Sequence, residues 1–186
     1  MSLIAFVAFV GGSFIVMRVI AGDHQIQIIP GNFKNFTHTF FYTLNEEIVV
    51  GALLLKGIKS MAKKTPDWVI SLGAALVFSL IHFVFFKWIF INSGNLSIIT
   101  LSSLFFAGII RNNLILKTGH IGYSWAFHFG WIYIMLGSSH LDRASEIFLN
   151  DFERFGIYLG DYRTLIVCLV LAVASFFVLK KNSISS

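Results

Sequence analysis

Two adjacent glutamates, Glu46 and Glu47, stand near the middle of an apolar run that extends from about residue 36 to residue 55. The run is about 20 residues long, enough for a helix to cross the hydrocarbon core of a membrane. One charged residue at the centre of such a helix costs about 2.5–3.5 kcal/mol on insertion scales. Two neighbouring carboxylates therefore need a polar cavity, a buried partner or protonation. Two interpretations stay open, a structural contact between helices and a functional carboxylate inside the membrane.

The composition indicates a polytopic membrane protein. Hydrophobic residues make up 56% of the 186 residues and charged residues only 12%, whereas an ordinary soluble domain carries about 25% charged residues. The formal net charge of +5 does not indicate a nucleic-acid surface, because the lysines and arginines stand mostly between or beside apolar runs. The length fits a single transmembrane domain over residues 1–186. The one cysteine, Cys168, excludes an internal disulfide and predicts an ordinary packing residue.

Six apolar segments predict an all-α bundle with about six transmembrane helices. They cover about residues 3–21, 36–55, 68–90, 96–116, 121–136 and 162–179. Trp68 and Trp88 are predicted interface anchors at the two ends of the third segment, and a turn is predicted at residues 92–95. Between residues 137 and 161 the apolar positions favour a surface-lying amphipathic helix or a loop; they are Ile147, Phe148, Phe152, Phe155 and Ile157.

Six crossings place both termini on the same side of the membrane. Most of the basic residues fall near the helix ends, in the connections and in the tail that would share that side. They are Lys56, Lys59, Lys63, Lys64, Arg111, Lys117, Lys180 and Lys181. Because basic connections stay preferentially in the cytoplasm, the sequence predicts both the N-terminus and the C-terminus on the cytoplasmic side.

Two more apolar segments carry a histidine near their centres, His82 in the third and His128 in the fifth. A lone histidine on an apolar helix is usually a packing residue. Polar groups at comparable depth on three helices, however, usually face the bundle interior and find one another. A glutamate and two histidines can activate a water molecule as a general base with an imidazole partner, or they can ligate a divalent metal such as zinc. The residues alone do not separate these mechanisms.

The ordered set of motifs resembles the CPBP family of intramembrane peptidases, which includes the Rce1-like CAAX prenyl endopeptidases and the bacteriocin-processing Abi proteins. The family motif EExxxR resembles the stretch that begins at Glu46, and FxxxH is matched by Phe78 and His82. The motif HxxxN is matched at its histidine by His128. Two shorter family elements resemble FFAG at residues 105–108 and TGHI at residues 118–121. The motifs extend from residue 46 to residue 132, one to a predicted helix.

The resemblance implies a glutamate-dependent endopeptidase that cleaves a membrane-anchored or lipid-modified protein. It implies that Glu46 and His82 activate the attacking water, that Glu47 supports them, and that His128 donates to the oxyanion. It implies catalysis without a cofactor, with zinc bound by Glu46, His82 and His128 as the less favoured alternative. It also implies an integral protein of a bacterial or archaeal cell membrane, with lipid and a protein substrate as partners.

Two positions depart from the family pattern. Gly51 stands in the arginine place of EExxxR, one helical turn from Glu47, so a counter-charge is missing there. Arg18 or Arg111 from another helix is the candidate replacement. Ile132 stands in the asparagine place of HxxxN and has no hydrogen to donate. Losing one oxyanion donor typically costs a factor of about 10²–10³ in rate.

Other side chains are considered as replacements for the missing asparagine, and they are Asn45, Asn112, Asn113 and Trp131. The alternative to an active peptidase is a catalytically impaired member of the family that acts as a membrane binding, immunity or scaffold protein. A small proton-coupled transporter is a third hypothesis. It is disfavoured because the sequence shows neither an internal repeat nor broken helices.

Overall fold

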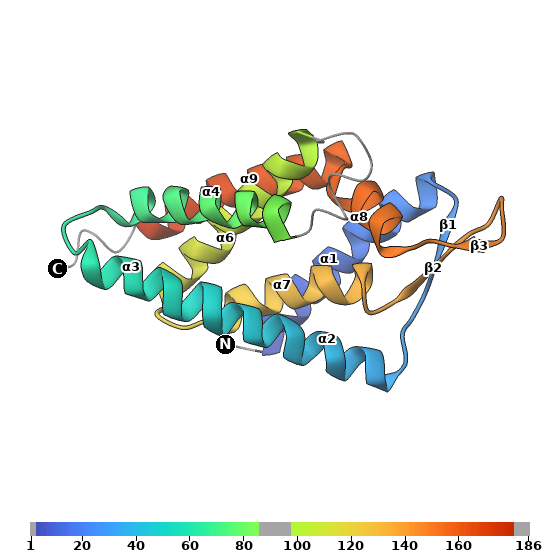
Figure 1. Ribbon diagram of the computed structural model, residues 1–186, viewed down its shortest axis with the longest axis horizontal. Helices are drawn as coiled ribbons and strands as arrows, with labels where there is room; N and C mark the ends of the chain where they lie inside the picture. Colours follow the sequence, from blue (N-terminus) through green and yellow to red (C-terminus); the bar gives the residue numbers. More distant parts are fainter. Residues whose placement is uncertain (1–2, 86–97, 181–186) are drawn as a thin grey trace.

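The computed structural model describes residues 3–85 and 98–180, and the described part of each apolar segment that predicts a transmembrane helix is largely helical (Figure 1). Five of these helices are α1 (Leu3–Asp23), α4 (Asp67–Phe85), α6 (Ile98–Thr118), α7 (Gly122–Met135) and α9 (Tyr162–Lys180). The glutamate-bearing segment comprises α2 (Phe33–Glu46), the π-helical turns η1 (Glu47–Leu54) and α3 (Leu55–Met61). The predicted all-α class is therefore confirmed. Trp88, the turn at residues 92–95 and Lys181 lie outside the described residues.

The number of membrane crossings differs from the prediction. Among the described residues, α1 and α6 are long and apolar enough to cross a membrane. A third crossing is counted if α8 (Asp151–Leu159) and the part of α9 up to Phe177, bent by 59° at their junction, are taken together. Six crossings are not confirmed, because the glutamate-bearing segment is divided by η1 and α7 has only 14 residues. A helix of that length spans only about 21 Å.

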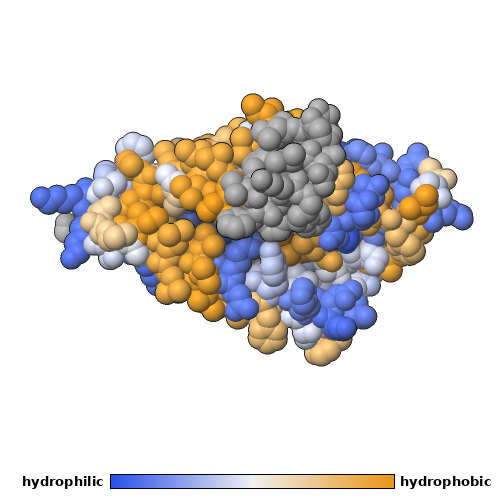
Figure 2. Space-filling model, viewed as in Figure 1, coloured by the Kyte–Doolittle hydropathy of each residue, from blue (hydrophilic) through white to orange (hydrophobic). Residues whose placement is uncertain are grey.

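The helices form a bundle around α6 and α7. Helix α6 packs between α4 and α9, and α7 packs against α1 and α2. The buried core lies between these elements and includes Met17, Phe78, Ile109 and Phe127. Many large apolar side chains are instead exposed on the outside of the bundle. Figure 2 shows a broad apolar area on the face of the molecule that it draws. An outward apolar surface of this extent suits a lipid environment, since soluble monomers rarely expose large apolar patches.

A small antiparallel sheet at one end of the bundle was not predicted (Figure 1). Strand β1 (Ile26–Ile29) pairs with β2 (Ser139–Asp142), and β2 pairs with β3 (Ile147–Phe148). The sheet ties the connection between α1 and α2 to the segment that follows α7.

The segment from residue 137 to residue 161 is therefore not one amphipathic helix or a loop. Ile147 and Phe148 are exposed on the edge strand β3, and only the part from Asp151 onward forms the helix α8. Asn150 begins α8 with a capping box that it shares with Glu153, and Phe155 is buried. Ile147 and Phe148, shortly before Asn150, are extended because they pair with β2, so they do not form part of an amphipathic helix.

His140, in β2, is only 1% exposed and packs edge-on against Tyr158, with ring centroids 5.3 Å apart. Burial, together with the charge of Arg154, lowers the pKa of His140 to about 4. A histidine in the unfolded chain titrates near pH 6.5, so below that pH the unfolded state binds more protons. We expect the protein to lose stability as the pH falls through this range to about 4.

Thermal unfolding in detergent, measured from pH 7 downward, tests this expectation. His140→Gln should weaken the dependence of the unfolding midpoint on pH, whereas His120→Gln, at an exposed histidine, should leave it unchanged. An equal dependence in the wild type and in His140→Gln would contradict the assignment.

Candidate active site

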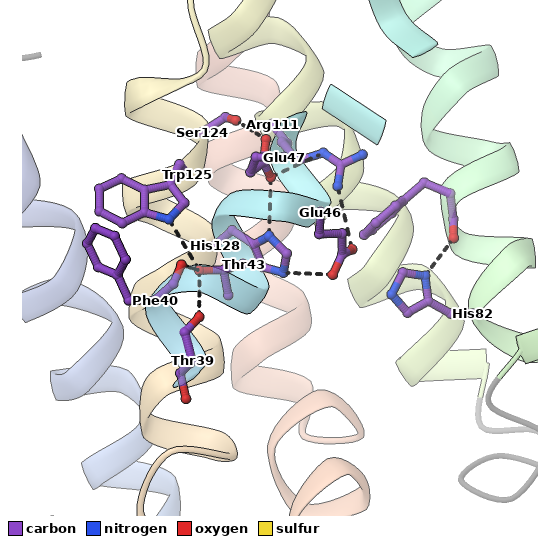
Figure 3. Close-up of polar contacts among 11 residues, drawn as sticks. Thr39, Phe40, Thr43, Glu46, Glu47, His82, Arg111, Ser124, Trp125 and His128 are labelled. Atoms are coloured by element: carbon purple, nitrogen blue, oxygen red, sulfur yellow. Dashed lines mark hydrogen bonds and ion pairs between the residues drawn. The ribbon is translucent and has the colours of Figure 1, made fainter. Parts of the chain in front are cut away.

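The two glutamates occupy the point where α2 passes into the π-helical turns. Glu46 is the last residue of α2 and Glu47 the first of η1. The side chain of Glu46 is 20% exposed, whereas that of Glu47 is completely buried. π-helical turns are rare and are often found at functional sites. The adjacent carboxylates thus occupy different environments, because Glu46 lines a cavity and Glu47 lies in the packed interior. Figure 3 shows the polar contacts of both.

Glu47 is held by side chains from two other helices. The hydroxyl group of Ser124 on α7 donates a hydrogen bond to Oε2 of Glu47. Nδ1 of His128, one turn further along α7, lies 3.2 Å from Oε1. Nε of Arg111, on α6, lies 3.6 Å from the same oxygen. A buried carboxylate needs such donors and counter-charges, so Glu47 joins three helices at one point.

Gly51 makes room for this arrangement. A Cβ atom at this position would lie 2.7 Å from Oε2 of Glu47 and 2.9 Å from Cδ1 of Ile115. The position that carries arginine in the family motif is thus filled by the Glu47 carboxylate itself. Of the two arginines considered as replacements, the structure brings Arg111 to the glutamates. Arg18 lines a separate hollow at the end of α1.

Glu46 interacts with Tyr42, one turn earlier in α2, and it faces two side chains from other helices at distances longer than a hydrogen bond. Nε2 of His128 lies 3.9 Å from its Oε2, and Nη1 of Arg111 lies 4.0 Å from its Oε1. Gaps of this size between polar groups are commonly bridged by water. The Glu46 carboxylate therefore has the geometry to hold an oxygen atom between itself and either partner.

His82, on α4, is the third predicted site residue that lines the cavity with Glu46 and His128. Its Nδ1 lies 2.7 Å from the carbonyl oxygen of Phe78, one turn earlier in the same helix. A carbonyl oxygen only accepts, so Nδ1 carries the hydrogen and Nε2 of the neutral ring holds the lone pair. The rings of Phe78 and His82 also pack at a centroid distance of 4.3 Å. The spacing FxxxH thus fixes the tautomer that a proton acceptor at Nε2 requires.

Two cavities meet at these residues. One has a volume of about 370 Å³ and extends from Glu46, His82 and His128 to Phe155 and Asp151 of α8. The other has a volume of about 450 Å³ and runs between η1 and α4. Its apolar lining residues are Val49, Val50, Leu54, Ala74, Val77, Phe78 and Ile81. Both cavities are lined by Glu46, His82 and Arg111. These three polar side chains therefore lie where the two cavities meet, and most of the surrounding cavity wall is apolar.

The residues considered in place of the missing asparagine are placed differently. Asn112 donates to the carbonyl oxygen of Ser71 at 3.0 Å, and Asn113 donates to Oγ of Ser175 at 2.7 Å. Both amide groups are therefore directed at other helices. Ile132 lines the first cavity, together with Trp131, and Asn45 lines the second.

Sequence reasoning missed two parts of the site. Ser124 lies four residues before His128, on the same face of α7, and this spacing was the available signal. His38, on α2, also lines the first cavity. A second contact between α7 and α2 is the hydrogen bond from Nε1 of Trp125 to Oγ1 of Thr43, at 3.2 Å.

A metal ion has no evident set of ligands here. In the ranges 3–85 and 98–180, no group of three or more histidine, cysteine, aspartate and glutamate side chains is arranged to hold one. The Arg111 guanidinium, 4.0 Å from Glu46, adds a positive charge that opposes a second cation. Independence of metal stays a prediction and is tested by chelation below.

Comparison with known proteins gives one match. The model of a family described as type II CAAX prenyl endopeptidase Rce1-like matches residues 34–134, which is more than half of the chain. The matched range contains Glu46, Glu47, His82, Arg111 and His128. No curated protein and no solved structure matches the chain.

Proposed function

Because the chain belongs to the Rce1-like family of type II CAAX prenyl endopeptidases, we propose that it cleaves a prenylated or otherwise membrane-anchored protein by means of a water molecule activated at Glu46. The observation that carries the proposal is the position of Glu46 and His82 at the junction of two cavities. His128 and Arg111 stand within 4.0 Å of the Glu46 carboxylate.

The proposed reaction begins with a water molecule between Glu46 and Nε2 of His82. As its oxygen forms a bond to the scissile carbonyl carbon, one proton passes to this pair and the carbonyl electrons move to the oxygen. When the tetrahedral intermediate collapses, the C–N bond breaks and the stored proton passes to the departing amine. The products are a new carboxylic acid, which keeps the second proton of the water until it ionises, and a new amine, and the two side chains return to their starting state.

His128 and Glu47 act together in this scheme. Nδ1 of His128 donates its hydrogen to Glu47, which orients the ring. In the protonated ring Nε2 carries a hydrogen as well and is a second donor. In that form Nε2 donates to the developing oxyanion. Glu47, fully buried, does not reach the cavities and serves as a positioning residue.

The surroundings of the site fit a substrate that arrives from the membrane. Apolar side chains of η1 and α4 line the second cavity, which can accommodate a lipid chain or an apolar segment. We further propose six crossings with both termini in the cytoplasm. The lysines at the α3 end of the bundle then face the cytoplasm, and the three-stranded sheet, at the opposite end, faces the other side (Figure 1).

A reconstituted assay tests the function. The purified protein in liposomes is incubated with a farnesylated peptide ending in a CAAX sequence, and with the same peptide lacking the lipid. We expect mass spectrometry to detect cleavage of the farnesylated peptide and slower cleavage of the unmodified one. An intact farnesylated peptide after incubation with folded protein would rule the proposal out.

Chelation separates the two mechanisms of water activation. We expect cleavage to proceed at an unchanged rate after treatment with EDTA and 1,10-phenanthroline, because Glu46 and His82 activate the water without a metal. A zinc peptidase treated in parallel serves as the control. Loss of cleavage that zinc restores would contradict the proposed mechanism.

A further inference from the structure

We propose that Arg111 is the second oxyanion donor, replacing from α6 the asparagine that position 132 lacks. The inference rests on the proposed peptidase function and assigns a catalytic role within it. It accounts for Ile132, which lines the first cavity but cannot donate a hydrogen bond.

Arg111 has buried donor atoms that face the two glutamates without forming a hydrogen bond. The residue is 3% exposed, and among the described residues its Nε and Nη1 atoms find no hydrogen-bond partner. An unsatisfied buried donor costs about 1–3 kcal/mol, more when it is charged. Arg111 also lines both cavities. A side chain held in this state is prepared to bind an oxygen atom that enters the cavity.

The position of the guanidinium group suits an oxyanion beside the attacking water. Nη1 lies 4.0 Å from Oε1 of Glu46. Charge-assisted hydrogen bonds are about 2.7–2.9 Å long, so an oxyanion that accepts from Nη1 can lie beside Glu46, close to the water that donates to this carboxylate. The scissile carbonyl must come close to the water that Glu46 holds. The donor therefore stands on the side of Glu46 where negative charge develops.

The guanidinium lies between an aromatic ring and a carboxylate. Its central carbon lies 4.1 Å from the centre of the Phe78 ring, and Nε lies 3.6 Å from Oε1 of Glu47. A donor fixed before the reaction needs no reorganisation as charge develops, which is the basis of oxyanion stabilisation. Arginine also carries its charge at all accessible pH values, so its donation does not depend on the protonation of His128.

The competing role is that of a counter-charge to the glutamates, which the arginine missing at position 51 would have supplied. The two roles differ in what can replace them. An asparagine at position 132 restores a hydrogen-bond donor without restoring charge. It would stand one turn after His128 on α7, where the family motif places it.

The test compares Arg111→Met with the double variant Arg111→Met/Ile132→Asn on the farnesylated peptide in liposomes. We expect Arg111→Met to lower kcat by about 10²–10³ with little change in KM, as loss of an oxyanion donor does. The double variant should recover at least about tenfold of this loss. Thermal unfolding in detergent establishes that each variant is folded, and the pair Arg111→Lys and Arg111→Lys/Ile132→Asn is used if the methionine variant does not fold.

Two results would overturn the proposal. One is an unchanged kcat in Arg111→Met. The other is a folded double variant that is no faster than the single one, because then charge and not donation was lost. Failure of the underlying function is seen separately, since the wild type itself would then leave the peptide intact.

Discussion

Glu46→Gln is expected to reduce kcat for a prenylated peptide by a factor of about 10²–10⁴, the range that a positioned general base contributes. The amide has nearly the shape of the carboxylate but cannot accept a proton from water. Because Glu46 is 20% exposed and stands at the edge of the cavities, the change should leave the unfolding temperature close to that of the wild type.

The matched control is Glu146→Gln, which removes the same charge at an exposed position beyond β2. It should cleave at the wild-type rate in the same liposomes. Cleavage by Glu46→Gln at the rate of the control would contradict the assignment of Glu46 as the general base.

Glu47→Ala is expected to act on stability. The change removes the carboxylate that contacts Arg111 and His128 and accepts from Ser124, and it leaves the Arg111 charge buried. Breaking a buried ion pair by removing one partner costs about 3–5 kcal/mol. Unfolding in mild detergent should therefore show a large loss in Glu47→Ala and a small one in Glu46→Ala, although the two residues are neighbours.

A double variant identifies the source of the loss. Glu47→Ala/Arg111→Met removes both charges, so it should be destabilised by less than the sum of the two single variants. Additive losses, or equal stability of Glu47→Ala and Glu46→Ala, would show that the pairing seen between Glu47 and Arg111 contributes little.

The helices of this fold could be predicted from the apolar segments of membrane length. In lipid the backbone N–H and C=O groups of such a segment find no water, so they must hydrogen-bond to one another, as they do in a helix. The meeting of Glu46, His82 and His128 could be anticipated for a similar reason. Each lies near the centre of its own apolar segment in the sequence, and the interior of the bundle is the place where such groups avoid lipid. The family match over residues 34–134 confirms the resemblance that these motifs indicate.

Other features depend on contacts that no local pattern encodes. Strand β1 pairs with β2, more than one hundred residues later, and β3 has only two residues. Arg18 and Arg111 both lie within apolar helices, and only the packing of α6 against α4 and α7 brings Arg111 to the glutamates. Gly51, within the π-helical turns after Glu46, likewise packs against Glu47 and against Ile115 of α6, which is far away in the sequence.

The most direct test of the central claim is mass spectrometry of one farnesylated CAAX peptide incubated in liposomes with the wild type and, separately, with Glu46→Gln. The account predicts two fragments whose masses sum to that of the peptide plus one water with the wild type, and the intact peptide with the variant. An intact peptide with both proteins, or the same fragments in equal amount with both, would contradict it.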